Sequence, residues 1–334
     1  MGIIKLSVLD LSPVSSGSNG RQALLNTLDL ARLADRLGYT RYWMAEHHNS
    51  AGLASSVPEI LIGHVADVTE RIRVGSGGIM LPNHSSLKVA ETFRVLEALH
   101  PGRIDLGLGR APGTDMLTAQ ALRRPATRDS FPEQLGELLA FLGGGFPEGH
   151  PYRRIIAIPE DAPSPQLWML SSSGYGAQVA AELGMGLAFA HHIHPDPAVA
   201  ALRLYRQSFK ASAQCREPRS ILAVAALCAE DQAEAERLAG PFDLVRLRIE
   251  QGRSGKFPSV EEAAAYPYEA AEQQRIRENR ARFFVGTPDL LKARISALAA
   301  EAGAAEVMVL TMAHDHGARL RSYALLAEAF DLNP

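Results

Sequence analysis

Several features that mark particular classes of protein are scarce or missing in this sequence. Its 334 residues include only two cysteines, Cys215 and Cys228, too few for a disulfide framework or a thiolate metal site, so we expect two buried thiols. The 34 basic and 37 acidic residues give a net charge of −3, which argues against binding to nucleic acid or to an anionic membrane. No apolar run approaches the roughly 18 residues that span a bilayer. We therefore expect a soluble, cytoplasmic protein with no membrane partner.

What the sequence does contain is an alternation of short apolar runs with amphipathic segments. Eight runs are typical of buried strands: residues 5–11, 41–46, 72–80, 104–109, 166–171, 186–190, 221–228 and 306–311. Helix starts are predicted at two S-x-x-E capping boxes, Ser56 and Ser130, and at Thr287 before a proline. Helix ends are predicted at Gly38 and Gly184, and a last amphipathic segment covers residues 319–330.

Eight strand–helix units predict a parallel α/β sheet, and the number eight favours closure into a (β/α)8 TIM barrel. An open doubly wound sheet is the alternative. Because about 250 residues suffice for such a barrel, we expect residues 1–334 to form a single barrel domain with rim insertions near 111–164 and 240–282. Both insertions follow predicted strands, at the end of the barrel where enzymes carry their substrate loops.

Candidate functional residues stand where the predicted strands end, since barrel enzymes place their chemistry there. The second strand ends in Glu46, His47 and His48, the third in Ser76, Gly77 and Gly78, the fourth in Gly107, Gly109 and Arg110, and the fifth in residues 171–174. Three of these ends are rich in glycine, which indicates close approach of the backbone to something bulky. Tight turns between strand and helix would need glycine as well.

Arg110 and the serine run at 171–173 predict an anion site. An arginine offers a planar fork of donors to a phosphate, and the serines precede a helix that begins near Tyr175, whose free N–H groups can bind an anion. Together these features imply a phosphorylated ligand, although an N-cap and a surface ion pair would explain either one alone. A nicotinamide fingerprint is not met, because Pro112 stands where G-x-G-x-x-G needs its third glycine.

Two other chemistries of barrel enzymes are disfavoured. The neighbouring histidines at 47–48 and 191–194 are not expected to bind metal, because consecutive residues of a strand point to opposite faces. A Schiff-base aldolase needs a lysine directed into the barrel, and the strand lysine present, Lys5, stands at the start of its strand and thus at the wrong rim.

Four segments together resemble the bacterial luciferase-like, flavin-dependent monooxygenases. They are RYWMAEHH at 41–48, IRVGSGGIMLP at 72–82, GRIDLGLGRAPGTD at 102–115 and SSSGYGAQVAAELG at 171–184. The likeness extends over residues 5–192 and, more weakly, over 285–330. It implies a (β/α)8 barrel that binds FMN non-covalently, receives reduced flavin from a separate flavin reductase and inserts one oxygen atom of dioxygen into a small organic substrate. It also implies a homodimer.

The resemblance assigns roles to individual residues. His47 matches the family's active-site histidine and is a candidate acid or base. The expected phosphate contacts of FMN are Arg110, Ser172, Ser173, Gly174 and Tyr175, and those of its ring system are Ser76, Gly77 and Gly78. A non-prolyl cis peptide or a β-bulge is expected between Gly77 and Gly78.

The resemblance leaves alternatives open. A deazaflavin- or flavin-dependent reductase or dehydrogenase, or a flavin-binding protein without turnover, would share the same site. The apolar residues that would form a dimer face are equally suited to covering the barrel; they are Ile60, Leu61, Val65, Val89, Phe93 and Leu96.

Overall fold

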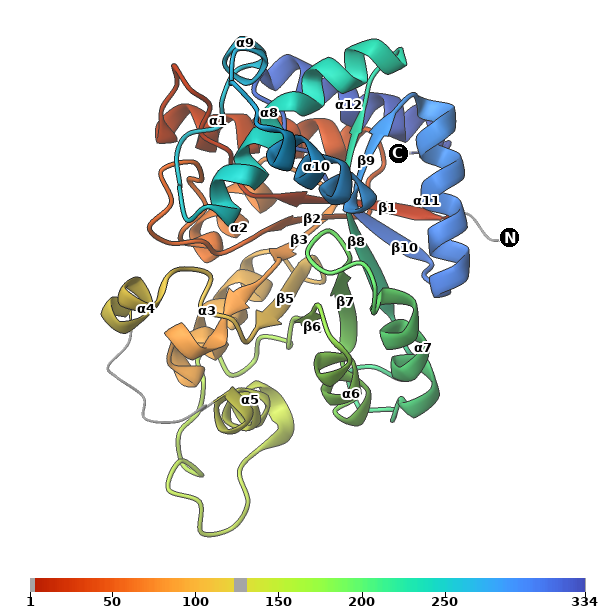
Figure 1. Ribbon diagram of the computed structural model, residues 1–334. Coiled ribbons are helices and arrows are strands. Elements are labelled where there is room, and N and C mark those ends of the chain that lie inside the picture. Colours follow the sequence, from red (N-terminus) through yellow and green to blue (C-terminus); the bar gives the residue numbers. More distant parts are fainter. Residues whose placement is uncertain (1–3, 123–130, 334) are drawn as a thin grey trace.

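Eight parallel strands form a closed barrel in the computed structural model, which describes residues 4–122 and 131–333 (Figure 1). The strands are β1 (Lys5–Asp10), β2 (Arg41–Met44), β3 (Arg73–Ser76), β5 (Ile104–Gly109), β6 (Gln166–Ser171), β7 (Gly186–Ala190), β8 (Ser220–Cys228) and β10 (Glu306–Leu310). The barrel closes because β10 pairs with β1 on one side and with β8 on the other. The predicted (β/α)8 fold is confirmed, and an open doubly wound sheet is excluded.

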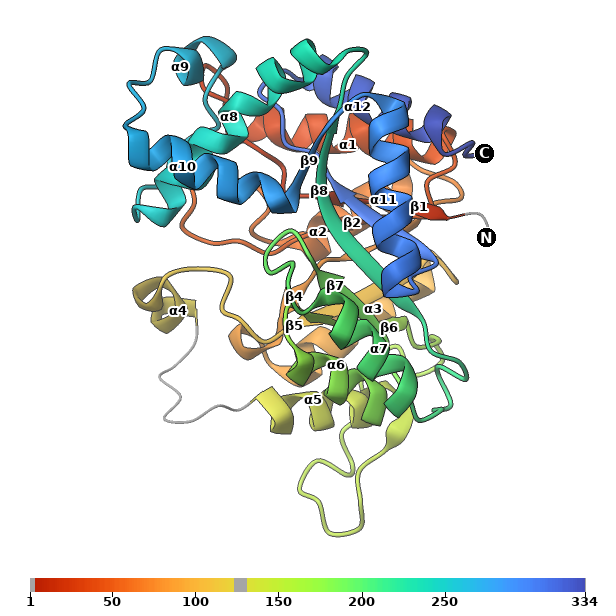
Figure 2. The same cartoon turned by 45° about the vertical axis from the view of Figure 1, so that its right-hand side comes forward.

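Helices surround the strands on the outside (Figures 1 and 2). In chain order they are α1 (Gly20–Arg36), α2 (Pro58–Asp67), α3 (Ser86–Leu99), α4 (Met116–Leu122), α5 (Phe131–Leu139), α6 (Gly174–Glu182), α7 (Ala198–Ser208), α8 (Gln232–Glu250), α9 (Val260–Ala264), α10 (Ala270–Asn279), α11 (Pro288–Ala302) and α12 (His316–Ala329), with the short helical turns η1 (Leu81–Asn83), η2 (Ala140–Gly144) and η3 (Arg280–Arg282).

The predicted helix boundaries hold at most of the positions that the structure describes. Gly38 and Gly184 follow α1 and α6 with φ of 82° and 60°, the left-handed conformation that favours glycine after a helix. Thr287 is the N-cap of α11. The capping box predicted at Ser56 is wrong, because α2 begins one residue later, with Val57 as N-cap and no side-chain cap bond. The box predicted at Ser130 lies outside the described residues.

The third predicted strand is interrupted. It consists of β3 and β4 (Ile79–Met80), both of which pair with β5. Gly77 and Gly78 lie between them and are joined by a cis peptide bond, as expected from the sequence. A further strand, β9 (Phe283–Gly286), was not predicted. It pairs with Ala225–Cys228 of β8, three residues of which lie beyond the pairing with β10, which ends at Ala225.

The segment 240–282, expected as an irregular insertion, is largely helical. Helix α8 continues through Gly240 and Pro241 to Glu250, and α9, α10 and η3 follow. The sequence obscured these helices because Pro241 interrupts the pattern of α8 and because α10 buries only Asn279, so it has no apolar stripe. The segment 111–164 contains α4, α5 and η2 among its described residues.

The core has two layers. Helices pack on the outer face of the strands, and five of the six residues considered for a dimer face belong to this layer: Leu61, Val65, Val89, Phe93 and Leu96. Only Ile60 of that set is exposed, at 60%, so these residues cover the barrel. A second apolar cluster around Trp43, Trp168 and Met308 fills the barrel interior.

Charged side chains close the amino end of the barrel. Arg41 bonds Asp105 at 2.7 Å and Glu306 at 2.8 Å, and Arg73 bonds Asp105 at 2.7 Å. The two carboxylates are buried, so each charge is compensated within the plug. Because this end is filled, any ligand site of the barrel belongs at the carboxyl ends of the strands, as in other barrels of this type.

Candidate active site

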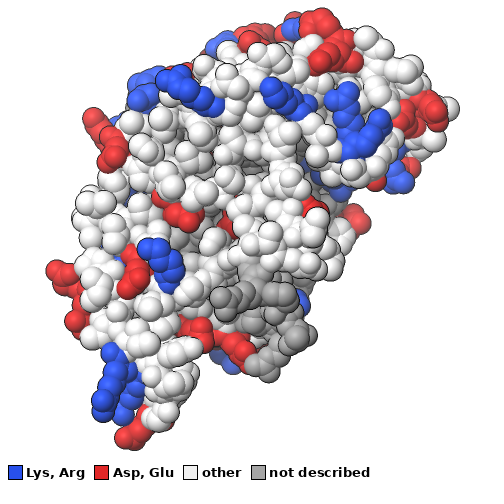
Figure 3. Space-filling view, turned by 90° about the vertical axis from the view of Figure 1, so that its left-hand side faces the viewer, with Lys and Arg blue, Asp and Glu red and all other residues white. Residues whose placement is uncertain are grey.

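The carboxyl ends of the strands face the viewer in Figure 3, since β1 begins near the N-terminus at the right of Figure 1 and runs to the left. Uncharged side chains make up most of the middle of this face. Basic side chains gather across its upper part. This end of the molecule carries the residues that follow β2, β4, β5, β6 and β7.

Glu46, two residues after β2, is a buried carboxylate that holds several loops together. It accepts hydrogen bonds from the Met80 N–H at 2.8 Å and from Asn83 Nδ2 at 2.9 Å. It also bonds Nε2 of His48 at 2.9 Å and Nε2 of His84 at 3.0 Å. Burial alone would raise the pKa of Glu46, but the hydrogen bonds with His84 and His48 bring that pKa below its usual range. Glu46 is therefore an ionised, fully bonded anchor.

His47 differs from both of its neighbours. Its backbone N–H donates to the Ser55 carbonyl at 2.9 Å, while its side-chain Nδ1 is buried and has no hydrogen-bond partner among the described residues. Burial lowers the pKa of His47 despite the nearby Glu46 charge. The imidazole is thus neutral near pH 7, and an unsatisfied buried nitrogen is costly unless a ligand bonds it.

His192 follows β7 and lines the same end of the barrel. Its ring Nδ1 lies 3.1 Å from the Ala223 carbonyl oxygen. Burial lowers the pKa of His192 to about 4, and the charge of His47 is among the smaller causes of that shift. The His192 imidazole is thus neutral near pH 7. Sequence reasoning had considered His192 only as an unlikely metal ligand.

The residues predicted to bind phosphate come together between β5 and α6. The Arg110 guanidinium lies over the Tyr175 ring, 5.2 Å from its centroid. Ser173 is the N-cap of α6, and its side chain makes no cap bond. The N–H groups of Gly174 and Tyr175 have no acceptor in the described part of the chain, as at any uncapped helix start. The arginine, the serine hydroxyls and this helix end form one cradle suited to an anion.

Ser76 and the glycines near it serve the barrel itself. The buried Ser76 hydroxyl donates to the Gly107 carbonyl at 2.9 Å and accepts from the Gly107 N–H at 3.0 Å. A Cβ at Gly78 would lie 2.7 Å from the Gly107 oxygen, and a Cβ at Gly107 would lie 2.1 Å from the Ser76 oxygen. Contact between adjacent strands thus accounts for Gly78 and Gly107. The hydroxyl proton of Ser76 is thereby committed to the Gly107 carbonyl, and contact of Ser76 with the ring system of a cofactor stays a prediction.

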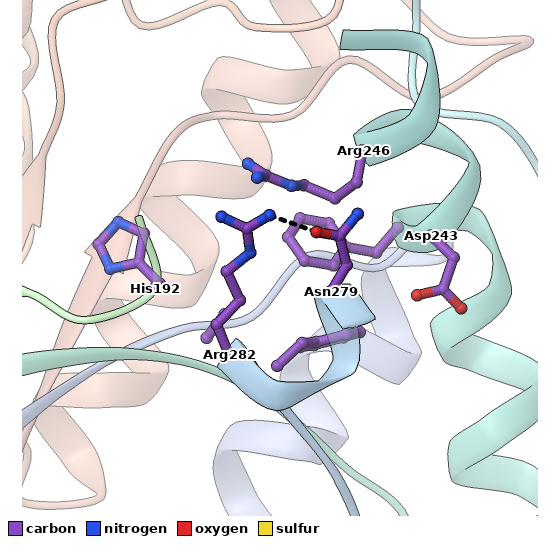
Figure 4. Close-up of a pocket in the computed structure, with 8 residues that line it drawn as sticks. His192, Asp243, Arg246, Asn279 and Arg282 are labelled. Atoms are coloured by element: carbon purple, nitrogen blue, oxygen red, sulfur yellow. Dashed lines mark hydrogen bonds between the residues drawn. The ribbon is translucent and has the colours of Figure 1, made fainter. Parts of the chain in front are cut away.

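Residues that the sequence analysis did not single out also line this end. Asn83 and His84 stand at the end of η1, the short turn that follows β4, and contact Glu46; their position close after a strand was a usable signal. A small cavity of about 10 Å³ lies beside His192 and includes Arg246 and Arg282 in its lining (Figure 4). These arginines are 36 positions apart in a segment expected to be irregular, so no spacing in the sequence connects them.

Neither a metal site nor a membrane segment is found in residues 4–122 and 131–333. Within those ranges, no three histidine, cysteine, aspartate or glutamate side chains are arranged to hold a metal ion. Their helices are all too short or too polar to cross a bilayer. Cys215 and Cys228 are free and buried, as predicted.

Comparison with known proteins gives a consistent family relationship. The family model for luciferase-like monooxygenases matches residues 4–306. A luciferase-like monooxygenase of Escherichia coli (strain K12) is 40% identical, covering 96% of this chain and 96% of its own length. An N-acetyl-S-alkylcysteine monooxygenase of Bacillus subtilis (strain 168) is 34% identical and covers 98% of each chain. The crystal structure of apo-MsnO8 is 41% identical, has a TM-score of 0.90 and covers 99% of this chain and 98% of its own.

More distant structures share the fold. The oxygenating constituent of 3,6-diketocamphane monooxygenase of Pseudomonas putida, in complex with FMN, has 18% identity and a TM-score of 0.71, covering 98% of this chain and 97% of its own. An F420-dependent secondary alcohol dehydrogenase with an F420–acetone adduct has 14% identity and a TM-score of 0.70, covering 100% of each chain. At these identities the likeness concerns the barrel alone.

Proposed function

The chain belongs to the luciferase-like monooxygenase family, and from this premise we propose that it uses reduced FMN and dioxygen to insert one oxygen atom into a small organic substrate. The observation that carries the proposal is His47, whose buried Nδ1 has no partner among the described residues. A neutral imidazole with a free ring nitrogen is equipped to exchange a hydrogen bond or a proton with a bound ligand. When bound, reduced FMN supplies the two electrons that this use of dioxygen requires.

The cradle between β5 and α6 fits the phosphate of FMN. Arg110 presents a fixed planar cation, and the start of α6 presents backbone N–H groups that favour negative charge. The hydroxyls of Ser172 and Ser173 add donors at the same place. We propose that these groups, with Gly174 and Tyr175, hold the phosphate and thereby fix the position of the cofactor at the barrel mouth.

The ring system of the cofactor would then lie over the middle of the mouth. We assign its contacts to the backbone of Gly77 and Gly78, which lies between β3 and β4. His47 would bond the reacting groups through Nδ1, holding or moving one proton there. The apolar interior around Trp43 and Trp168 lies below the mouth, and exclusion of water would limit the release of hydrogen peroxide without formation of product. A separate flavin reductase and a homodimeric state complete the proposal.

The test is coupled oxygen consumption with chemically reduced FMN. The first compounds to assay are N-acetyl-S-alkylcysteines, because one relative is named for them. We expect dioxygen uptake to match the amount of an oxygenated product, which takes up one labelled atom when ¹⁸O₂ is supplied. Reduced deazaflavin, offered in place of FMN, provides the comparison between cofactors. Hydrogen peroxide as the sole product with every compound, or a preference for deazaflavin, would contradict the proposal.

A further inference from the structure

Two arginines from separate elements meet at the edge of the barrel mouth. Arg246 comes from α8 and Arg282 from η3, and in Figure 4 the Arg282 side chain extends toward the guanidinium end of Arg246. The two side chains are 26% and 24% exposed. They are therefore largely covered by the chain but still reachable from outside.

The positive charge of this pair is poorly compensated. Both guanidiniums share a single carboxylate, Glu250, at 4.0 Å from Arg246 and 3.5 Å from Arg282. Glu250 also pairs with Arg275 at 3.7 Å. The other acidic residue of the cavity, Asp243, is bonded to Arg280 at 2.6 Å. Because Arg275 has a closer partner in Glu278, at 3.0 Å, Glu250 is the carboxylate left for Arg246 and Arg282, and within the described residues it is the one acidic partner of either.

The two arginines are held in different ways. Arg282 is fixed by its bonds to the Ile193 carbonyl, at 3.1 Å, and to Asn279, drawn as a dashed line in Figure 4. The Arg246 guanidinium forms no hydrogen bond with any residue of the described ranges. Burial lowers the pKa of Arg246, and the like charge of Arg282 lowers it further, yet an arginine stays charged near neutral pH. The N–H groups of Arg246 can therefore donate hydrogen bonds to a ligand, next to the fixed positive charge of Arg282.

Apolar residues form another part of the cavity lining. Phe242 and Phe283 pack edge to face with centroids 4.5 Å apart, and Ala225 of β8 lies beside them. His192 belongs to the same lining, and it follows β7 at the end of the barrel that also carries His47. A molecule with an anionic end at the arginines would extend past His192 toward the imidazole of His47. The cavity itself, about 10 Å³, is the size of a single water site, so the anionic group would meet the guanidiniums at the opening of the cavity and the body of the molecule would lie outside it.

We propose that Arg246 and Arg282 form a subsite for the carboxylate of the substrate, which makes the substrate an organic acid with an apolar body. Two guanidiniums match the two oxygens of a carboxylate, and such charge-assisted bonds are strong and directional. The inference rests on the proposed function, because the acid is the compound to be oxygenated at the mouth. Its failure can be separated from that of the oxygenase chemistry by measuring binding without flavin.

The experiment compares two ligands that differ in charge. Hexanoate and hexanamide are titrated into the full-length protein by calorimetry, at low ionic strength and without other carboxylates or phosphate in the buffer. We expect hexanoate to bind at least tenfold more tightly than hexanamide, with a preference that declines as KCl is added. Absence of hexanoate binding, or equal affinity for the two compounds, would overturn the subsite.

Variants of two arginines on the same helix locate the site. Arg246→Gln is expected to abolish the preference for hexanoate, and Arg246→Lys to restore part of it. Arg248→Gln is the matched control, because Arg248 also lies on α8 but does not line the cavity. It should keep the preference unchanged. If Arg246→Gln kept the preference, or if Arg248→Gln lost it to the same degree, the assignment to Arg246 would be wrong.

Discussion

Glu46, His47 and His48 show how much the surroundings of a residue determine its role. All three follow β2 without interruption, yet Glu46 and His48 bond each other at 2.9 Å while the buried Nδ1 of His47 has no partner in the described ranges. The sequence predicted that the two histidines would point apart, and the family resemblance singled out His47, whose catalytic role stays a prediction. It could not predict that Glu46 also binds His84, because that contact joins residues 38 positions apart.

Replacement of His47 by alanine tests its proposed role as an acid or base. We expect His47→Ala to reduce oxygenated product by about 100-fold or more, in the range usual for loss of a general acid or base. FMN affinity should stay nearly unchanged, because the phosphate cradle is built from other residues. Product formation under ¹⁸O₂ and FMN titration measure the two effects. His316→Ala, which alters a histidine paired with Asp29 at 3.0 Å, is the control.

The pH profile gives a second readout of the same residue. Burial lowers the pKa of His47 from its ordinary 6.5, so the neutral form dominates down to a pH below 6.5 and is lost only as the pH falls further. We therefore expect the acid limb of kcat/KM to have its midpoint below pH 6.5 and to disappear in His47→Ala. A midpoint above 6.5, or a limb that persists in the variant, would show that another group titrates.

At the scale of elements, the glycine-rich strand ends have a structural cause. The sequence suggested either close approach of a ligand or tight turns between strand and helix, and the structure shows a different cause at Gly78 and Gly107, the close contact of neighbouring strands. The strands themselves were readable because buried parallel strands are continuous apolar runs. Helices α9 and α10 could not be predicted from the sequence, because short or polar helices carry no apolar stripe. Strand β9 was overlooked for a related reason, since Phe283–Gly286 is only four residues long.

Two glycine-to-alanine changes test whether strand packing requires these glycines. They are expected to change the free energy of unfolding in opposite directions. In Gly107→Ala the new Cβ would meet the Ser76 oxygen at 2.1 Å, so β3 and β5 would have to separate. We expect a loss of more than about 3 kcal/mol in the free energy of unfolding. In Gly136→Ala the Cβ meets nothing within 4 Å on α5, and alanine should add about 0.5 to 1 kcal/mol. Urea denaturation measures both, and similar values for the two would refute the packing argument.

At the scale of the whole molecule, the barrel has one closed and one open end. The ion pairs of Arg41, Asp105 and Glu306 fill the amino end, while His47, Arg110 and His192 lie at the other. The number of strand–helix units was enough to predict the closed barrel and hence the end at which the site lies. The pairing of Arg246 with Arg282 was not predictable, because it depends on how α8 and η3 pack across the rim.

The proposed function depends above all on whether the mouth of the barrel binds the phosphate of FMN. Anaerobic titration of dithionite-reduced FMN and of reduced riboflavin, which lacks the phosphate, measures this directly in the wild type and in Arg110→Ala. Arg237→Ala is the control, because Arg237 is an exposed arginine paired with Glu234 on α8.

We predict that the wild type binds reduced FMN more tightly than reduced riboflavin. Arg110→Ala should weaken FMN binding by roughly 1.5 to 3 kcal/mol, the usual worth of a hydrogen bond to a charged group, and leave riboflavin binding unchanged, whereas Arg237→Ala should match the wild type. If reduced FMN did not bind, or if Arg110→Ala kept the full preference for FMN over riboflavin, the account of this site would be contradicted.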